Sequence, residues 1–301
     1  MTPRSQRLTG PVIAVITAVV SGFAIFLNGY GVASWSDAGV GATAYTTAKN
    51  LVAALVLGAI ALMSLRRRGR ETRIQQHRWR LLAVGIIGGA VPFVLFFEGL
   101  ARASSLHGAF IHKTLVVWVA LIAVPVLGER LSGLHLAAIG LLVGGEAAIA
   151  GVHGIRFGAG EAMILAATLL WAIEVVVAKV ALRDVPATIV GAARMGIGAV
   201  VLAGWTIASG GMAGLTSLPA VAWAWVALTG AVLTAYVATW YLALSRAQAV
   251  DVTAVLVLGA LVSAALRTGF SGVGHPAPIG VVLLALGGIA ALVAMRRPAP
   301  R

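Results

Sequence analysis

Ionisable side chains interrupt several long apolar stretches of this chain, and such residues could do chemistry inside a lipid bilayer. A charge at the centre of a bilayer costs at least about 2.5–3.5 kcal/mol on insertion scales, so an ionisable residue at that depth is a functional candidate by default. The candidates are Lys49, Glu98, Lys113, Glu146, Glu174 and Arg194, joined by the polar residues Asn28 and His112.

Glu174 lies near the middle of the apolar stretch 160–182. Loss of hydration at that depth favours the neutral carboxyl, so the group can load and release a proton. We therefore predict that Glu174 is the coupling residue of a proton-driven process. The alternative is that Lys113, Lys49 or Arg194 neutralises Glu174 merely to hold helices together.

Three cations are candidates for binding the carboxylate or phosphate of a substrate. Lys113 directly follows His112, and these polar residues interrupt an otherwise apolar stretch. Lys49 and Arg194 lie in two further apolar stretches. A long basic side chain can instead extend toward the lipid headgroups. Lys113, His112, Lys49 and Arg194 are thus predicted substrate-binding residues, with a structural role as the alternative.

Aromatic residues accompany these ionisable groups. Tyr45 lies four residues before Lys49, and Trp171 lies three residues before Glu174, which places each pair on one helical face. We predict that Tyr45, Trp171 and Tyr236 bury the apolar part of a substrate, with core packing as the alternative.

Motifs that carry enzymatic chemistry are absent from the sequence. It contains no cysteine, which excludes disulfides, thiolate metal sites and cysteine nucleophiles. It also lacks the His-Glu-x-x-His, phosphate-loop and Gly-x-Ser-x-Gly patterns, and its histidines are scattered. We expect neither enzymatic activity nor a cofactor or metal ion.

The composition indicates where these residues lie. The 301 residues are 60% hydrophobic and only 10% charged, with a mean hydropathy of +1.00, whereas soluble domains have about 25% charged residues. Most of the surface must therefore face lipid, and the class is an all-α polytopic membrane protein. Apolar runs predict ten membrane-spanning helices, at 11–32, 41–64, 80–100, 105–127, 134–151, 160–182, 187–208, 221–243, 250–267 and 277–295.

The net charge of +13 is concentrated in the connections between these helices. The positive-inside rule assigns the arginine-rich second connection to the cytoplasm, and ten spans then place both chain ends, 1–10 and 296–301, there as well. We interpret the charge as a determinant of topology in a cytoplasmic (inner) membrane, not as a nucleic-acid site. The arginines of that connection are Arg66, Arg67, Arg68, Arg70, Arg73, Arg78 and Arg80.

The two halves of the chain resemble one another. Residues 43–59 align with 188–204, which sets Lys49 against Arg194, and 96–106 align with 240–250, which sets Arg102 against Arg246. We predict two five-helix repeats, 11–151 and 160–295. Because five is odd, the second repeat crosses the membrane in the opposite sense, as in many secondary transporters.

Two prolines lie well inside predicted spans. Pro92 and Pro125 each free a backbone carbonyl and are candidate hinges. Glu146 lies in a helix rich in small residues, and we predict a structural role for it in close helix packing. With Gly128 and Glu129, these residues form the predicted structural or gating set.

Residues 100–145 resemble the first-repeat ending of the EamA-like drug/metabolite transporters. The resemblance rests on the PVLGE stretch at 125–129 and the following Ile139-Gly140 and paired glycines. Leu170-Trp171-Ala172 is similar to the opening of that family's repeat. The second repeat departs from the pattern, because it has no counterpart of Pro125, Gly128 and Glu129. The resemblance implies a ten-helix exporter of small metabolites or amino-acid-like compounds with both ends cytoplasmic.

The sequence therefore favours a secondary transporter, namely a proton-coupled exporter of a small amino-acid-like or other metabolite. Its expected partners are the substrate, the lipid bilayer and protons. An alternative is efflux of lipophilic cations, with Glu174 or Glu146 as the binding charge. A second alternative is a scaffold or lipid-handling protein that moves no solute.

Overall fold

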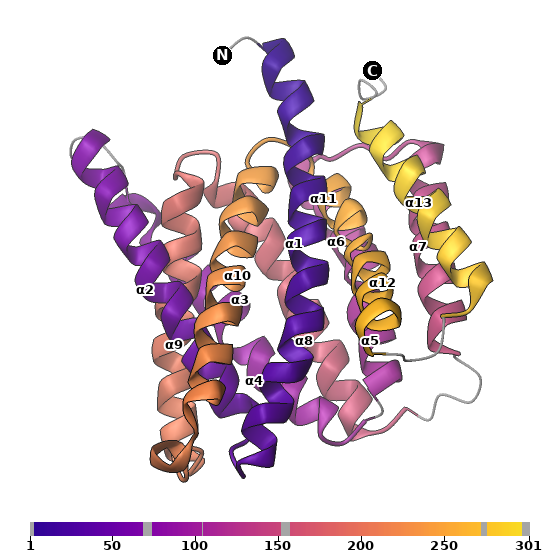
Figure 1. The fold of residues 1–301 in the computed structure, drawn as a ribbon. Helices are drawn as coiled ribbons and strands as arrows, with labels where there is room; N and C mark the ends of the chain where they lie inside the picture. Colours follow the sequence, from indigo (N-terminus) through magenta and orange to yellow (C-terminus); the bar gives the residue numbers. More distant parts are fainter. Residues whose placement is uncertain (1–2, 69–73, 104, 152–156, 272–275, 297–301) are drawn as a thin grey trace.

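The computed structural model describes residues 3–68, 74–103, 105–151, 157–271 and 276–296. These residues form a bundle of helices without a strand (Figure 1), and ten helical spans are long and apolar enough to cross a membrane. The predicted all-α class and the ten spans are confirmed. Arg70 and Arg73 of the arginine-rich connection lie outside the described residues.

The first half of the chain supplies five spans, two of which are interrupted. Its helices are α1 (Pro3–Asp37), α2 (Ala42–Arg68), the short 3-10 helix η1 (Ile74–His77), α3 (Arg78–Gly89), α4 (Val91–Leu100), α5 (Ser105–Lys113), α6 (Leu115–Leu127) and α7 (Gly133–Ala150).

The second half supplies five more, one of which is interrupted. Its helices are α8 (Ala159–Ala181), α9 (Ala187–Ala208), the 3-10 helix η2 (Leu215–Ser217), α10 (Ala220–Leu244), α11 (Ala249–Leu256), α12 (Gly259–Ser271) and α13 (Pro278–Arg296).

The interruption between α3 and α4 follows from the sequence. Ala90 leaves the helical conformation with φ −129° and ψ −77°, and Pro92 lies in the first turn of the next helix. Proline has no N–H and its ring clashes with the carbonyl four residues earlier, which here is that of Gly88. The Gly88 carbonyl is therefore available to partners outside its own helix.

Two further interruptions occur, one in the fourth span of each half. One lies at Thr114, between α5 and α6, and the other at Val257 and Leu258, between α11 and α12. Pro125, by contrast, lies inside α6 without interrupting it. Because a membrane has no water to hydrogen-bond an interrupted helix, such breaks are tolerated where they are buried in protein or line a cavity.

Helices of the two halves pack against one another throughout the bundle. The closest packed pairs are α7 with α13, α1 with α10, α2 with α9, α4 with α8, and α3 with α9. Small residues allow the closest approaches: a Cβ added at Gly145 of α7 would lie 2.9 Å from the Gly280 carbonyl oxygen of α13. Large apolar side chains such as Leu55 and Val200 remain exposed on the outer surface, as a lipid-facing surface requires.

The start of α1, the end of α2 and the end of α13 lie at the same end of the bundle (Figure 1). This end of the bundle, which we call the termini end, also carries Arg66 and Arg296.

Candidate functional site

A cavity of about 280 Å³ lies in the centre of the bundle, between helices of both halves. It is near the lower limit for small-molecule sites, which is roughly 300 Å³. All but one of the residues predicted for coupling and substrate binding line it, namely Lys49, His112, Lys113, Trp171, Glu174, Arg194 and Tyr236. We call it the central cavity.

The Gly88 carbonyl organises one wall of the central cavity. Freed by Pro92, it accepts hydrogen bonds from Trp171 Nε1 at 3.0 Å and Arg194 Nη2 at 3.1 Å. A buried carbonyl without a partner would destabilise the fold, and these two side chains satisfy it. The proline break thereby fixes the positions of an aromatic ring and a cation.

Glu174 lies beside this carbonyl and is only 1% exposed. Its Oε1 accepts a hydrogen bond of 2.5 Å from the hydroxyl of Tyr241 on α10, and the positive charge of Arg194 interacts with it. The absence of a side chain at Gly88 makes room for both: an added Cβ would collide with Glu174 and lie 3.2 Å from Arg194 Nε.

Lys49 of α2 is held by Asn28 of α1, and both residues line the central cavity. Its Nζ donates to Asn28 Oδ1 at 2.8 Å and lies 5.6 Å from the centroid of the Tyr45 ring. Tyr45 is the one predicted substrate-binding residue outside the lining. It is fully buried, and its hydroxyl shares a 2.7 Å hydrogen bond with Thr229.

Lys113 ends α5 at the helix interruption. Lys113 lines the central cavity, and its ammonium has no hydrogen bond to any described residue. Its charge interacts with that of Glu146 on α7. Glu146 is buried outside the lining, and its Oε1 has no hydrogen-bond partner among the described residues.

Aromatic rings form the apolar wall of the central cavity. Trp171 lies 4.9 Å from His112, 5.3 Å from Phe93 and 5.5 Å from Phe96, between ring centroids. Edge-to-face and tilted contacts of this kind stabilise aromatic clusters. The rings are tilted by 59–82° to one another and form an apolar wall, and Lys113 directly follows His112 of this wall.

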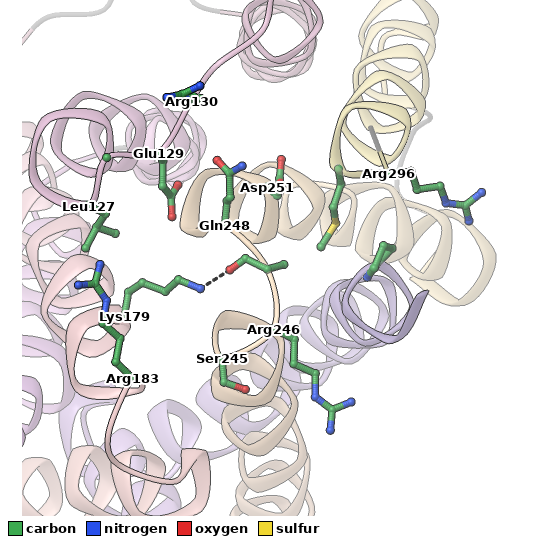
Figure 2. Close-up of a pocket in the computed structure, with 14 residues that line it drawn as sticks. Leu127, Glu129, Arg130, Lys179, Arg183, Ser245, Arg246, Gln248, Asp251 and Arg296 are labelled. Atoms are coloured by element: carbon green, nitrogen blue, oxygen red, sulfur yellow. Dashed lines mark hydrogen bonds between the residues drawn. The ribbon is translucent and has the colours of Figure 1, made fainter. Parts of the chain in front are cut away.

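A second cleft, of about 610 Å³, opens at the termini end. Figure 2 shows Lys179 reaching across it toward the connection between Ser245 and Gln248. The Lys179 ammonium donates to the carbonyls of Leu244, the last residue of α10, and of Ala247 in the connection that follows.

Glu129 holds the other side of this connection. Gly128 ends α6 in the left-handed conformation, with φ +70°, and Glu129 follows it. The Glu129 carboxylate accepts from the backbone N–H groups of Ala249 at 2.5 Å and Val250 at 3.0 Å, which begin α11. His135 Nε2 and Asp251 Oδ1, 3.0 Å apart, join α7 to the same helix.

Sequence reasoning missed several residues of the central cavity. Tyr241 was not assigned as the partner of Glu174, and Phe93 and Phe96 were not assigned to the lining. One signal was present: Gly88 lies four residues before Pro92, which marks the carbonyl that needs a partner. Nothing in the local sequence indicates which side chains provide it.

No group of three or more His, Cys, Asp or Glu side chains among the described residues is placed to hold a metal ion. The cavity instead contains isolated cations, one carboxylate and aromatic rings. Such groups can bind a small organic molecule and carry a proton. The fold is that of a polytopic α-helical membrane protein with a central cavity.

Comparison with known proteins gives a family match for the first part of the chain. Residues 8–150 match the model of the EamA-like transporter family, which confirms the resemblance seen in the sequence. The ten apolar helical spans and this match support a multi-pass membrane protein.

Solved structures give the fold. The chain is similar to a protein whose structure is titled only "Crystal structure of protein", with a TM-score of 0.72 and 19% identity, over 98% of this chain and 99% of that chain. At this identity the likeness shows the fold alone. No curated protein matches the chain.

Proposed function

We propose that this protein is a secondary transporter that exposes the central cavity alternately to the two sides of the cytoplasmic membrane. The substrate is a small metabolite, the coupling ion is a proton carried by Glu174, and net movement is outward. The observation that carries the proposal is the convergence of Lys49, Lys113, Arg194 and Glu174, from both halves of the chain, on one cavity at interrupted helices.

Two inverted repeats provide the moving parts. The contacts support this, because the most extensive packings between halves have counterparts when the halves are exchanged: α1 with α10 corresponds to α8 with α4, and α2 with α10 to α9 with α3. The alignment that sets Arg102 against Arg246 also sets Thr114 against Leu258, so the helix breaks match. Discontinuous helices at a midplane site are typical of such transporters.

The termini end is the cytoplasmic side in this proposal. The arginine-rich connection after α2 supports this orientation through the positive-inside rule. Pro92 acts as a structural hinge, and Glu129 acts at the gate of the termini end, because opening this end separates Glu129 from the start of α11. Pro125 and Gly128 set the end of α6, and Glu146 balances Lys113.

Glu174 loads and releases the proton while the three cations hold a negative group of the substrate. Tyr241 and Arg194 influence the balance between the protonated and the charged form of Glu174, since both interact with its carboxylate. The cavity gives less support to efflux of lipophilic cations, because three cations face one carboxylate in its lining.

A single cysteine tests alternating access without knowledge of the substrate, because the natural chain contains none. Ala24→Cys places the thiol in the lining of the central cavity. We expect a membrane-impermeant maleimide to label it from either side of oriented vesicles. Ala123→Cys, fully buried in the core, is the matched control and stays unlabelled.

Glu174→Gln, combined with Ala24→Cys, tests proton coupling. A pH gradient should change the ratio of labelling from the two sides when Glu174 is present and leave it constant in Glu174→Gln. Labelling from one side only, under every gradient, would contradict a transporter and favour the scaffold alternative.

A further inference from the structure

The polar groups that face the central cavity are mainly hydrogen-bond donors. Lys113 and Tyr236 line it, and neither the Lys113 ammonium nor the Tyr236 hydroxyl has a hydrogen bond to any described residue. Arg194 uses Nη2 on the Gly88 carbonyl, while its buried Nε has no partner among the described residues. Donors without acceptors in a buried site require a ligand rich in acceptors.

Acceptors for a cationic ligand are scarce in the same lining. Glu174 is the one carboxylate among the described residues of the lining, and its Oε1 already accepts from Tyr241. Asn28 Oδ1 already accepts from Lys49. An ammonium group entering this cavity would face three cations and would compete with Arg194 for Glu174.

The apolar wall indicates the shape of the remainder of the ligand. Phe93, Phe96, His112 and Trp171 present ring faces and edges, and Lys113 directly follows His112 at the helix break. A flat ring packs on these side chains at little entropic cost. An acidic group attached to that ring then reaches the Lys113 ammonium.

We propose that the central cavity selects an organic anion with an aromatic body and one acidic group, and that it rejects molecules carrying an ammonium group. This assignment rests on the proposed transport function and narrows its substrate class. It differs from an amino-acid-like substrate, because a zwitterion brings a second charge that the lining does not compensate.

Three probes of nearly equal size separate these classes. 3-Phenylpropionate carries only the carboxylate, phenylalanine carries a carboxylate and an ammonium, and 2-phenylethylamine carries only the ammonium. In calorimetric titration of the purified full chain, we expect 3-phenylpropionate to bind at least tenfold more tightly than phenylalanine, and 2-phenylethylamine not to bind. Equal or tighter binding of either amine, or no binding of 3-phenylpropionate at millimolar concentration, overturns the proposal.

Variants locate the acidic group. Lys113→Gln should weaken binding of 3-phenylpropionate at least tenfold, whereas Lys113→Arg, which keeps the charge, should retain most of it. Arg183→Gln removes a cation of the cleft at the termini end and should leave binding unchanged. Unchanged binding in Lys113→Gln, or the same loss in Lys113→Arg, overturns the role of the Lys113 charge.

The binding experiment and the labelling experiment can fail separately. If Ala24→Cys is labelled from both sides but 3-phenylpropionate does not bind, the protein alternates and the substrate class is wrong. If 3-phenylpropionate binds and the thiol is labelled from one side only, the site is assigned correctly and the transport proposal fails.

Discussion

Gly88→Ala tests whether the proline break and the buried carboxylate form one structural unit. A Cβ at this position would collide with Glu174 Cγ and lie 2.8 Å from its Cδ, well inside van der Waals contact. The Glu174 side chain must then move, which breaks its hydrogen bond with Tyr241.

The magnitude follows from these contacts. Overpacking a dense core costs typically about 1–3 kcal/mol, and a hydrogen bond to a charged group contributes about 1.5–3 kcal/mol. The better helix propensity of alanine offsets about 1 kcal/mol. We therefore expect Gly88→Ala to lower the free energy of unfolding by roughly 2–5 kcal/mol.

Thermal unfolding in detergent measures this effect against a matched glycine. Gly140 of α7 has no atom within 4 Å of an added Cβ, so Gly140→Ala should be neutral or slightly stabilising. In a chain of 301 residues, a loss of about 2 kcal/mol lowers Tm by roughly 3 °C relative to this control. In the Glu174→Ala background the side chain that would meet the new Cβ is gone. Gly88→Ala should therefore cost much less stability in that background than in the natural chain. Equal Tm values for the two alanine variants would refute the reasoning.

Three further substitutions address the partners that hold the site. Tyr241→Phe removes the hydroxyl that donates to Glu174. We expect the free energy of unfolding to fall by about 1.5–3 kcal/mol and the pH profile of proton flux to shift. An unchanged profile would argue against proton binding at Glu174. Glu129→Gln leaves one N–H at the start of α11 without its acceptor. The amides of Ala249 and Val250 should therefore exchange hydrogen at least about tenfold faster. Equal exchange rates would show that the carboxylate does not stabilise the start of α11. Lys179→Met removes the donor to the carbonyls of Leu244 and Ala247. We expect a loss of about 1.5–3 kcal/mol in thermal unfolding, whereas an unchanged Tm would count against this role.

The number and type of the elements could be predicted from the sequence. A membrane-spanning helix is a local property, set by about 20 consecutive apolar residues, and ten such stretches appear as ten helical spans. The interruption at Pro92 was also readable, because the missing N–H of proline acts within one turn. The break at Val257 and Leu258 has no proline and was not predicted.

The candidate residues were found through the cost of burying charge. Lys49, Lys113, Glu174 and Arg194 stood out because a bilayer penalises each of them wherever it packs, and the structure places all four around one cavity. Tyr45 illustrates the limit of helical periodicity. It shares a face with Lys49 as expected, yet its ring packs against Trp35, 5.5 Å away, instead of lining the cavity.

By itself, the sequence determined the all-α membrane class, the ten spans and the ionisable residues within them, because these follow from hydrophobicity within single stretches of about 20 residues. Only the tertiary structure decided the partners: Trp171 and Arg194 on the Gly88 carbonyl, Tyr241 on Glu174, and Glu129 at the start of α11. These contacts join residues far apart in the chain, and which of them meet depends on how whole helices pack.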